Sequence, residues 1–214
     1  MSEEIEPDKK EPEAVFNVSR PIRITLRSAE GEKVIGLRFP TDAEWIDRQR
    51  KRKITVKQLG RGLSETIVPD YSDVDLEFVR QIRTDEDGPE IDGYEAAEIF
   101  ARLSRCDIDE ILPASNLFQI SMRVPGGITR HTLFMPSAKD ISLYRRGFSR
   151  VLDSPCSQQQ LTINLQAASD LYAKLKPQAE GYAGAVPVIH QAAVVQAVIG
   201  ALESGIGVAD SENF

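Results

Sequence analysis

The sequence has few of the residues that most catalytic and metal sites require. Its 214 residues include two cysteines, two histidines and one tryptophan. Neither Cys106 nor Cys156 lies near a second cysteine or a histidine at metal-ligand spacing, and His131 and His190 have no such neighbours. We therefore expect no metal, no cofactor and two free thiols.

Signatures of enzymes are also missing. No segment resembles the local surroundings of a catalytic nucleophile. The glycine-rich stretch 60–64 lacks the Gly–Lys–Ser/Thr ending of a phosphate-binding loop. The acidic stretch 85–92 fails as a calcium loop, because the sixth and twelfth positions hold Glu90 and Ala96. We expect a protein that is not an enzyme, although distant residues can assemble into a triad.

Nothing at the N-terminus resembles a secretory leader, since Met1-Ser-Glu-Glu4 is acidic. The longest apolar stretch, residues 183–202, contains Pro187 and His190 and is not followed by basic residues. We expect it to hold a helix at about 191–203 and not a membrane span. With a net charge of −7, which disfavours nucleic acid as the main ligand, the sequence predicts a cytoplasmic globular protein.

One segment of the chain recurs 96 positions later without a gap. The matching pieces are Ile24-Thr-Leu-Arg27 with Ile120-Ser-Met-Arg123, Leu37-Arg-Phe-Pro40 with Leu133-Phe-Met-Pro136, and Thr66-Ile67 with Thr162-Ile163. Similarity at a fixed spacing indicates repeated structural units. We therefore predict a tandem duplication.

Each copy is predicted to contain a β-hairpin followed by three helices. Ile22, Ile24 and Leu26 alternate with polar residues, as in a half-buried strand, and a turn at Gly31 leads into a second strand. The pattern predicts an α+β fold in which helices cover small antiparallel sheets. The predicted segments are a disordered acidic tail at 1–19, a first ββααα copy at 20–110, a second copy at 116–203 and a flexible tail at 204–214.

The first helix of each copy has a clear start. Thr41 and Glu44 have the spacing of a capping box, and Ser137 and Asp140 repeat it. In the second copy we expect an apolar stripe that runs from Ile141 through residues 151–152. The single tryptophan, in the first turn of the first copy's helix, is expected in the core.

Two segments are candidate partner-binding surfaces. The first is the basic run Arg48, Arg50, Lys51, Arg52 and Lys53, which could be a solvated helix face, a site for an acidic protein or a site for nucleic acid. The second is the apolar face of the last helix, formed by Val195, Val198, Ile199 and Leu202. No catalytic residue is predicted.

Residues 24–45, followed by Leu59-Gly-Arg-Gly62-Leu-Ser-Glu-Thr66, resemble small proteins of tailed phages and prophages, in character tail assembly chaperones. In that family a short hairpin leads into a helical body that holds an aggregation-prone tail component before polymerisation. The resemblance implies a non-enzymatic assembly or virion-associated protein in a bacterial cytoplasm, with a tail component as its partner. Self-association into a homo-oligomer is a further possibility. The alternative function is a nucleic-acid-associated regulatory module that uses the basic helix 48–53.

Overall fold

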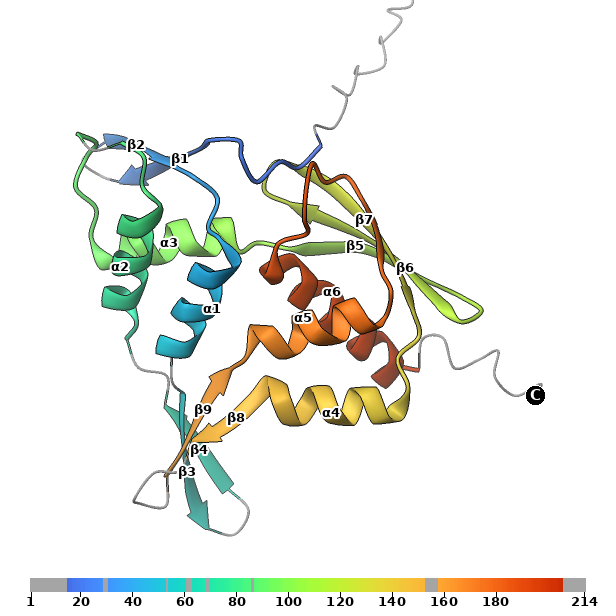
Figure 1. The fold of residues 1–214 in the computed structure, drawn as a ribbon. Coiled ribbons are helices and arrows are strands. Elements are labelled where there is room, and N and C mark those ends of the chain that lie inside the picture. The colour runs from blue at the N-terminus through green and yellow to red at the C-terminus, as the bar shows by residue number, and fades with distance from the viewer. Residues whose placement is uncertain are drawn as a thin grey trace, which may run out of the picture.

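The structure is a computed structural model (Figure 1). It describes residues 15–28, 31–52, 54–60, 63–67, 70–85, 87–152 and 158–205, with the backbone alone for residues 28, 56–60, 63–64, 149–152 and 158–162. The strands in these ranges are β1 (Ile22–Ser28), β2 (Gly31–Leu37), β3 (Ile54–Gly60), β4 (Leu63–Ile67), β5 (Asp107–Ala114), β6 (Leu117–Val124), β7 (Gly127–Phe134), β8 (Ser149–Leu152), β9 (Gln158–Ile163) and β10 (Gln178–Glu180). The helices are α1 (Asp42–Lys51), α2 (Ser72–Ile82), α3 (Gly93–Leu103), α4 (Ala138–Phe148), α5 (Leu165–Lys174) and α6 (Val188–Glu203).

The predicted α+β class is confirmed. All strand pairs are antiparallel, and they form three small sheets with the orders β1-β2, β10-β7-β6-β5 and β4-β3-β9-β8. We call the sheet β10-β7-β6-β5 the large sheet. Its strand β6 alternates buried residues with more exposed ones, because among the described residues one face of the sheet packs against helices and the other does not. Helix α6 packs on the buried face of β5 and β6 (Figure 1).

The order of elements recurs along the chain. The series β1-β2-α1-β3-β4-α2-α3 is followed by β6-β7-α4-β8-β9-α5-α6, and β5 and β10 are additions to the second series. Each copy thus contains a second hairpin, which is absent from the predicted order of one hairpin followed by three helices. The apolar stripe predicted for the helix through residues 151–152 is wrong at its end, because α4 ends at Phe148, next to Gly147, and the chain continues as β8.

The two copies share one hydrophobic core and one sheet. Strand β3 of the first copy pairs with β9 of the second, and buried residues from both copies form a single cluster. Phe16 is buried at 4% exposure, and its amide N–H donates to the carbonyl of Gly181 across 2.8 Å. The folded part therefore begins no later than Phe16, and the predicted tail to residue 19 is too long.

The predicted helix starts are present. The Thr41 hydroxyl accepts from the Glu44 amide, and the Glu44 carboxylate accepts from the Thr41 amide. Ser137 and Asp140 make the same exchange at the start of α4. Trp45 is fully buried, as predicted. Both copies therefore set the start of their first helix by the same local hydrogen bonds.

The apolar stretch 183–202 contains most of α6. None of the helices in the described ranges combines the length and apolar character needed to cross a bilayer.

Candidate functional site

The predicted basic surface of α1 is divided between the core and the surface. Arg48 is 2% exposed, and its Nε donates to the Asp75 carboxylate of α2 across 2.8 Å. Its guanidinium also lies over the ring of Phe100. Burial lowers the pKa of Arg48 to about 10, so the side chain stays charged at neutral pH. A partner cannot reach Arg48 in this structure, which corrects its place in the predicted surface.

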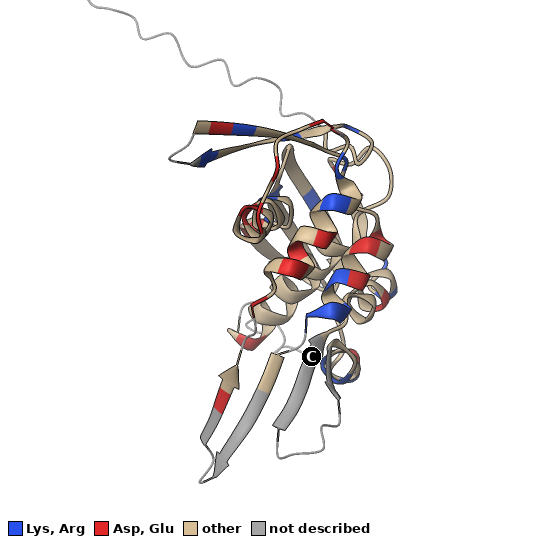
Figure 2. Ribbon diagram, turned by 90° about the vertical axis from the view of Figure 1, so that its left-hand side faces the viewer, with Lys and Arg blue, Asp and Glu red and all other residues tan. Residues whose placement is uncertain are grey.

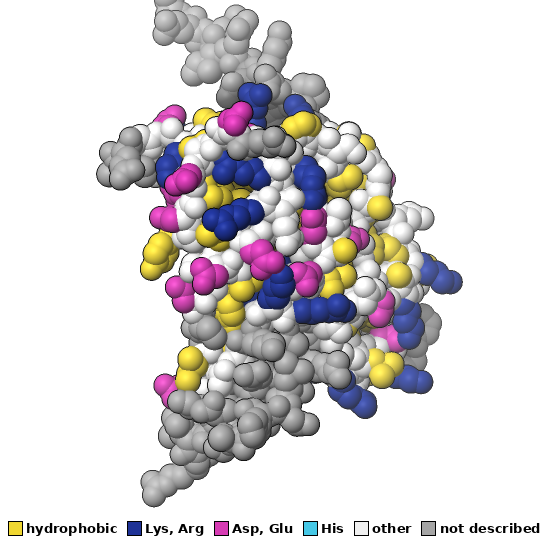
Figure 3. Space-filling model, turned by 60° about the vertical axis from the view of Figure 1, so that its left-hand side comes forward, with side chains coloured by type: hydrophobic (Ala, Val, Ile, Leu, Met, Phe, Trp, Pro, Cys, Tyr) yellow, Lys and Arg dark blue, Asp and Glu magenta, His cyan; other side chains and the backbone are white. Residues whose placement is uncertain are grey.

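The other described basic residues of this segment, Arg50, Lys51 and Arg52, do not form a concentrated positive patch. The Lys51 Nζ lies 3.1 Å from Asp47 Oδ2 and 2.9 Å from Glu77 Oε1, so it forms ion pairs with both carboxylates. Arg52 lies over the Tyr71 ring at 4.5 Å. Arg50 is exposed, and Lys53 falls outside the described residues. Basic and acidic residues alternate along the helices in the ribbon of Figure 2, and their side chains intermingle on the face shown in Figure 3. The described residues of this face therefore do not gather the positive charge that nucleic acid requires.

The apolar face of α6 is internal. Val195 and Val198 have no exposed surface and Ile199 has 7%, while Leu202 is half-buried against the same core. The helix lies between α5 and the β5-β6 part of the sheet, which cover it from two sides. The sequence correctly indicated a helix that must be covered, but the covering surface belongs to this chain. The predicted interface on α6 is corrected accordingly.

The two histidines are buried and meet through a tyrosine. The Tyr182 hydroxyl lies 3.2 Å from His131 Nε2 and 3.1 Å from His190 Nδ1. His131 Nδ1 lies 2.9 Å from the Tyr172 hydroxyl. Burial lowers the pKa to about 4 for His131 and about 3 for His190, so both rings are neutral at pH 7. These residues come from distant parts of the chain, which is why the sequence did not predict the network.

The described residues offer little for covalent or metal chemistry. No group of three or more histidines, cysteines and carboxylates is placed to hold a metal within them. Burial raises the pKa of the Cys106 thiol to about 12, so it is not a thiolate at neutral pH. Cys156 lies outside the described residues.

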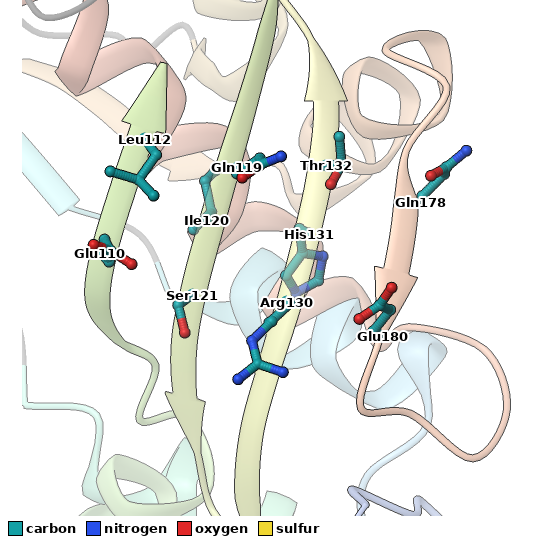
Figure 4. A pocket seen from close by; sticks show the side chains of 10 residues that line it. All are labelled: Glu110, Leu112, Gln119, Ile120, Ser121, Arg130, His131, Thr132, Gln178 and Glu180. Atoms are coloured by element: carbon teal, nitrogen blue, oxygen red, sulfur yellow. The ribbon is translucent and has the colours of Figure 1, made fainter. Parts of the chain in front are cut away.

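The exposed face of the large sheet is the candidate functional site. Two rows of side chains cross it, as the strand register requires, and they line a hollow of about 380 Å³ (Figure 4). One row is Glu110, Ser121, Arg130 and Glu180, and the next is Leu112, Gln119, Thr132 and Gln178. We call these eight residues the open face.

The open face combines free charge with exposed apolar surface. Arg130 forms no ion pair with any residue in the described part of the chain, although Glu110 and Glu180 line the same hollow. Beside them, Leu112 is 46% exposed and Phe134, on the same side of β7, is 43% exposed. Side chains of both kinds at one place are typical of protein–protein interfaces.

Sequence analysis missed the open face. The sequence predicts hairpin strands at residues 120–123 and 133–135 from their match to the first copy, and this match does not identify their outward side chains. The outward signal was present as the alternation of Gln119, Ser121 and Arg123 with apolar residues. Which outward residues lie together depends on the register of four strands. The sequence does not predict that β5 and β10 lie on either side of the β6-β7 hairpin.

No protein-family model, curated protein or solved structure matches the chain. The open face is therefore the feature from which a function is argued.

Proposed function

We propose that this protein is a non-enzymatic assembly factor that binds another protein through the open face. The observation that carries the proposal is that, in the part of the chain that the structure describes, helices pack against one side of the large sheet and none against the other. The other side leaves three charged side chains without ion-pair partners among the described residues, next to two exposed apolar ones. A partner that supplies complementary charges and covers the apolar residues would satisfy all five.

The charges of the open face define the chemistry of the partner. Two carboxylates, Glu110 and Glu180, flank the single guanidinium of Arg130 in one row. The whole chain has a net charge of −7. Complementarity therefore favours a partner segment that is basic overall, presents one carboxylate to Arg130 and carries an apolar side chain for Leu112 and Phe134. Binding should weaken as salt concentration rises, since the charges are exposed.

The sequence resemblance narrows the kind of partner. Residues 24–45 resemble tail assembly chaperones of tailed phages, so we propose a phage tail component as the partner, bound in the bacterial cytoplasm. Nothing in the described basic helix specifically favours the nucleic-acid alternative.

Co-purification with paired charge-reversal variants tests the proposal. The tagged protein is expressed in a host that carries the phage or prophage genes, treated with nuclease and analysed by mass spectrometry. Arg130→Glu reverses a charge on the open face, and Arg50→Glu makes the same reversal on the exposed side of the basic helix. We expect a protein partner that survives nuclease, is lost at least tenfold with Arg130→Glu and is retained with Arg50→Glu.

Two results would contradict the proposal. Loss of all bound material after nuclease would assign the binding to nucleic acid and to the basic helix. Retention of the partner by Arg130→Glu, Leu112→Asp and Phe134→Asp variants that remain folded would remove the open face as the binding site. Far-ultraviolet circular dichroism and Trp45 fluorescence verify that each variant is folded.

A further inference from the structure

The sheet β4-β3-β9-β8 is built jointly by the two copies. The first copy contributes the β3-β4 hairpin and the second contributes the β8-β9 hairpin. Each hairpin follows the first helix of its copy, so β8 corresponds to β3 and β9 corresponds to β4. This sheet is therefore a contact between two repeats of one structural unit.

The contact joins unlike strands. At its centre, β3 pairs with β9, the counterpart of β4. A symmetric contact between repeats would instead pair β3 with β8 or β4 with β9 across the junction. The observed contact is head-to-tail, and it leaves β4 at one edge and β8, the counterpart of β3, at the other. A head-to-tail contact leaves one of its two binding surfaces free at each end, so repetition of the contact generates rings or filaments.

We propose that these two edges bind each other between molecules: strand β8 of one molecule pairs with strand β4 of a second molecule of the same protein. The occupant follows from the sheet itself, because the free edges are the same two kinds of strand that already pair at its centre. This pairing would continue the sheet from one molecule into the next by main-chain hydrogen bonds. It does not depend on the partner proposed for the open face, which lies on a different sheet.

The internal contact predicts the register of the external one. Ile67 and Ile163 are equivalent at the 96-residue spacing, and they pair with Thr55 and Ser149 in their hairpins. Ser149 is thus the counterpart of Thr55. At the central contact Thr55 lies opposite Gln160, whose counterpart is Ser64. Ser149 should therefore lie opposite Ser64 of the next chain, with Arg150 opposite Leu63.

The edges of the two four-stranded sheets differ in how they are protected. The free edge strand β5 contains Pro113, a bulge between Ile108 and Glu110, and the carboxylates of Asp107 and Asp109. These are features that prevent pairing with another chain. Neither β4 nor β8 contains proline, and the pairing of β8 with β9 is continuous, whereas the pairing of β3 with β4 shifts register between Gln58 and Gly60. Both strands are short, but the existing contact between β3 and β9 also spans only four residue pairs.

Cysteine trapping tests the proposed contact. Cys106→Ser and Cys156→Ser remove the native thiols. In this background two single variants are made, one with Ser64→Cys and the other with Ser149→Cys. Opposite residues in antiparallel strands have Cα atoms about 4.5 or 5.5 Å apart, which a disulfide can bridge. We expect mild oxidation to link the two chains when they are mixed. Each chain alone should give at most one tenth of that yield.

A second pair and an off-register pair serve as controls. Leu63→Cys with Arg150→Cys should also link, because it is the neighbouring pair in the same register. Thr66→Cys with Ser149→Cys should not, because these positions are two residues out of register. A chain that carries both Ser64→Cys and Ser149→Cys should form a ladder of multimers or a closed ring on a denaturing gel.

Three results would overturn the proposal. Mixed chains that fold but stay unlinked at both predicted pairs would exclude the contact. Equal linking in single-variant samples would show a symmetric contact between like strands. Sedimentation velocity of the unsubstituted chain needs no variant, and a purely monomeric distribution up to about 1 mM protein would exclude self-association in the range where weak edge contacts form.

Discussion

The two copies have the same order of elements but differ in what they bury between their helices. In the first copy, α1 and α2 bury an ion pair, Arg48 with Asp75, among the rings of Trp45, Phe78 and Phe100. In the second copy, the residue 96 positions after Arg48 is Tyr144, and the residue 96 after Asp75 is Leu171. Both of these are buried as well.

We infer from this difference that the fold requires bulk at these positions and not charge. Arg48 Nη1 is buried without a hydrogen-bond partner in the described structure. A buried ion pair is expensive to desolvate, and an apolar replacement of the pair often costs nothing, whereas removal of one partner is costly. The ion pair therefore specifies the packing of the first copy without necessarily stabilising it.

The largest effect is expected from separating the ion pair. Asp75→Ala leaves the Arg48 guanidinium buried and unpaired, so we expect a loss of about 3–5 kcal/mol in the free energy of unfolding. The double variant Arg48→Tyr/Asp75→Leu, which transfers the second copy's residues into the first, should lie within about 1 kcal/mol of the unsubstituted chain or above it. Urea denaturation measures both.

A double variant as unstable as Asp75→Ala would contradict the claim that bulk alone is required. Leu171→Ala in the second copy is the matched truncation, with an expected cost of about 2–5 kcal/mol from the cavity.

The histidines should make the second copy sensitive to acid. Each has a folded pKa below the ordinary value of 6.5, at about 4 for His131 and about 3 for His190. The unfolded chain therefore binds more protons below pH 6.5, and stability falls as the pH decreases from 6.5 towards 4. The expected slope is up to about 1.4 kcal/mol per pH unit for each histidine. Denaturation at several pH values measures it.

His131→Ile tests this origin, because Ile35 occupies the equivalent buried position in the first copy. We expect a smaller slope between pH 6.5 and 4.5, while Ser137→Ala, an exposed substitution in the same copy that leaves the hydrogen bonds of both histidines in place, should leave it unchanged. An unchanged slope in His131→Ile would assign the acid sensitivity to other groups.

The starts of α3 and α6 are stabilised by carboxylates from different parts of the chain. Asp92, next to α3, caps that helix locally. The corresponding helix α6 begins at Val188, whose amide donates to Asp42 of the first copy across 2.8 Å. Asp42→Ala should therefore cost about 0.5–2 kcal/mol and increase hydrogen exchange at the start of α6. Exchange that rises only in α1 would show that the contact does not stabilise α6.

The smallest difference is expected at the shared capping boxes. Thr41→Ala and Ser137→Ala remove equivalent hydroxyls, and each should cost about 1 kcal/mol. The two losses should agree within about 0.5 kcal/mol, as measured by thermal or urea unfolding. A much larger loss in one copy would indicate that its cap also supports contacts elsewhere.

Local patterns predicted most of the elements. The alternation of Ile22, Ile24 and Leu26, the box at Thr41 and the recurrence at 96 residues identified the strands, the helix starts and the order of units. These signals depend on neighbours in the sequence, which is why they succeed without knowledge of the tertiary structure.

The candidate sites were poorly predicted because charge and apolar character do not reveal exposure. Arg48 belongs to a basic run, yet Asp75 and the ring of Phe100 give it a buried place. Val195 has the apolar character of an interface residue, yet the chain's own sheet covers it. The open face required the register of β10 on β7, a pairing between segments about 50 residues apart.

The central claim is that the two copies form a single cooperative unit. Urea unfolding followed by two probes in the same samples tests it most directly: the fluorescence of Trp45, the only tryptophan, reports on the first copy, and hydrogen exchange of α6 peptides reports on the second. Because the copies share a core and a sheet, the two probes should give one common midpoint. Midpoints separated by more than about 0.5 M urea would show that the copies unfold independently and would contradict the claim.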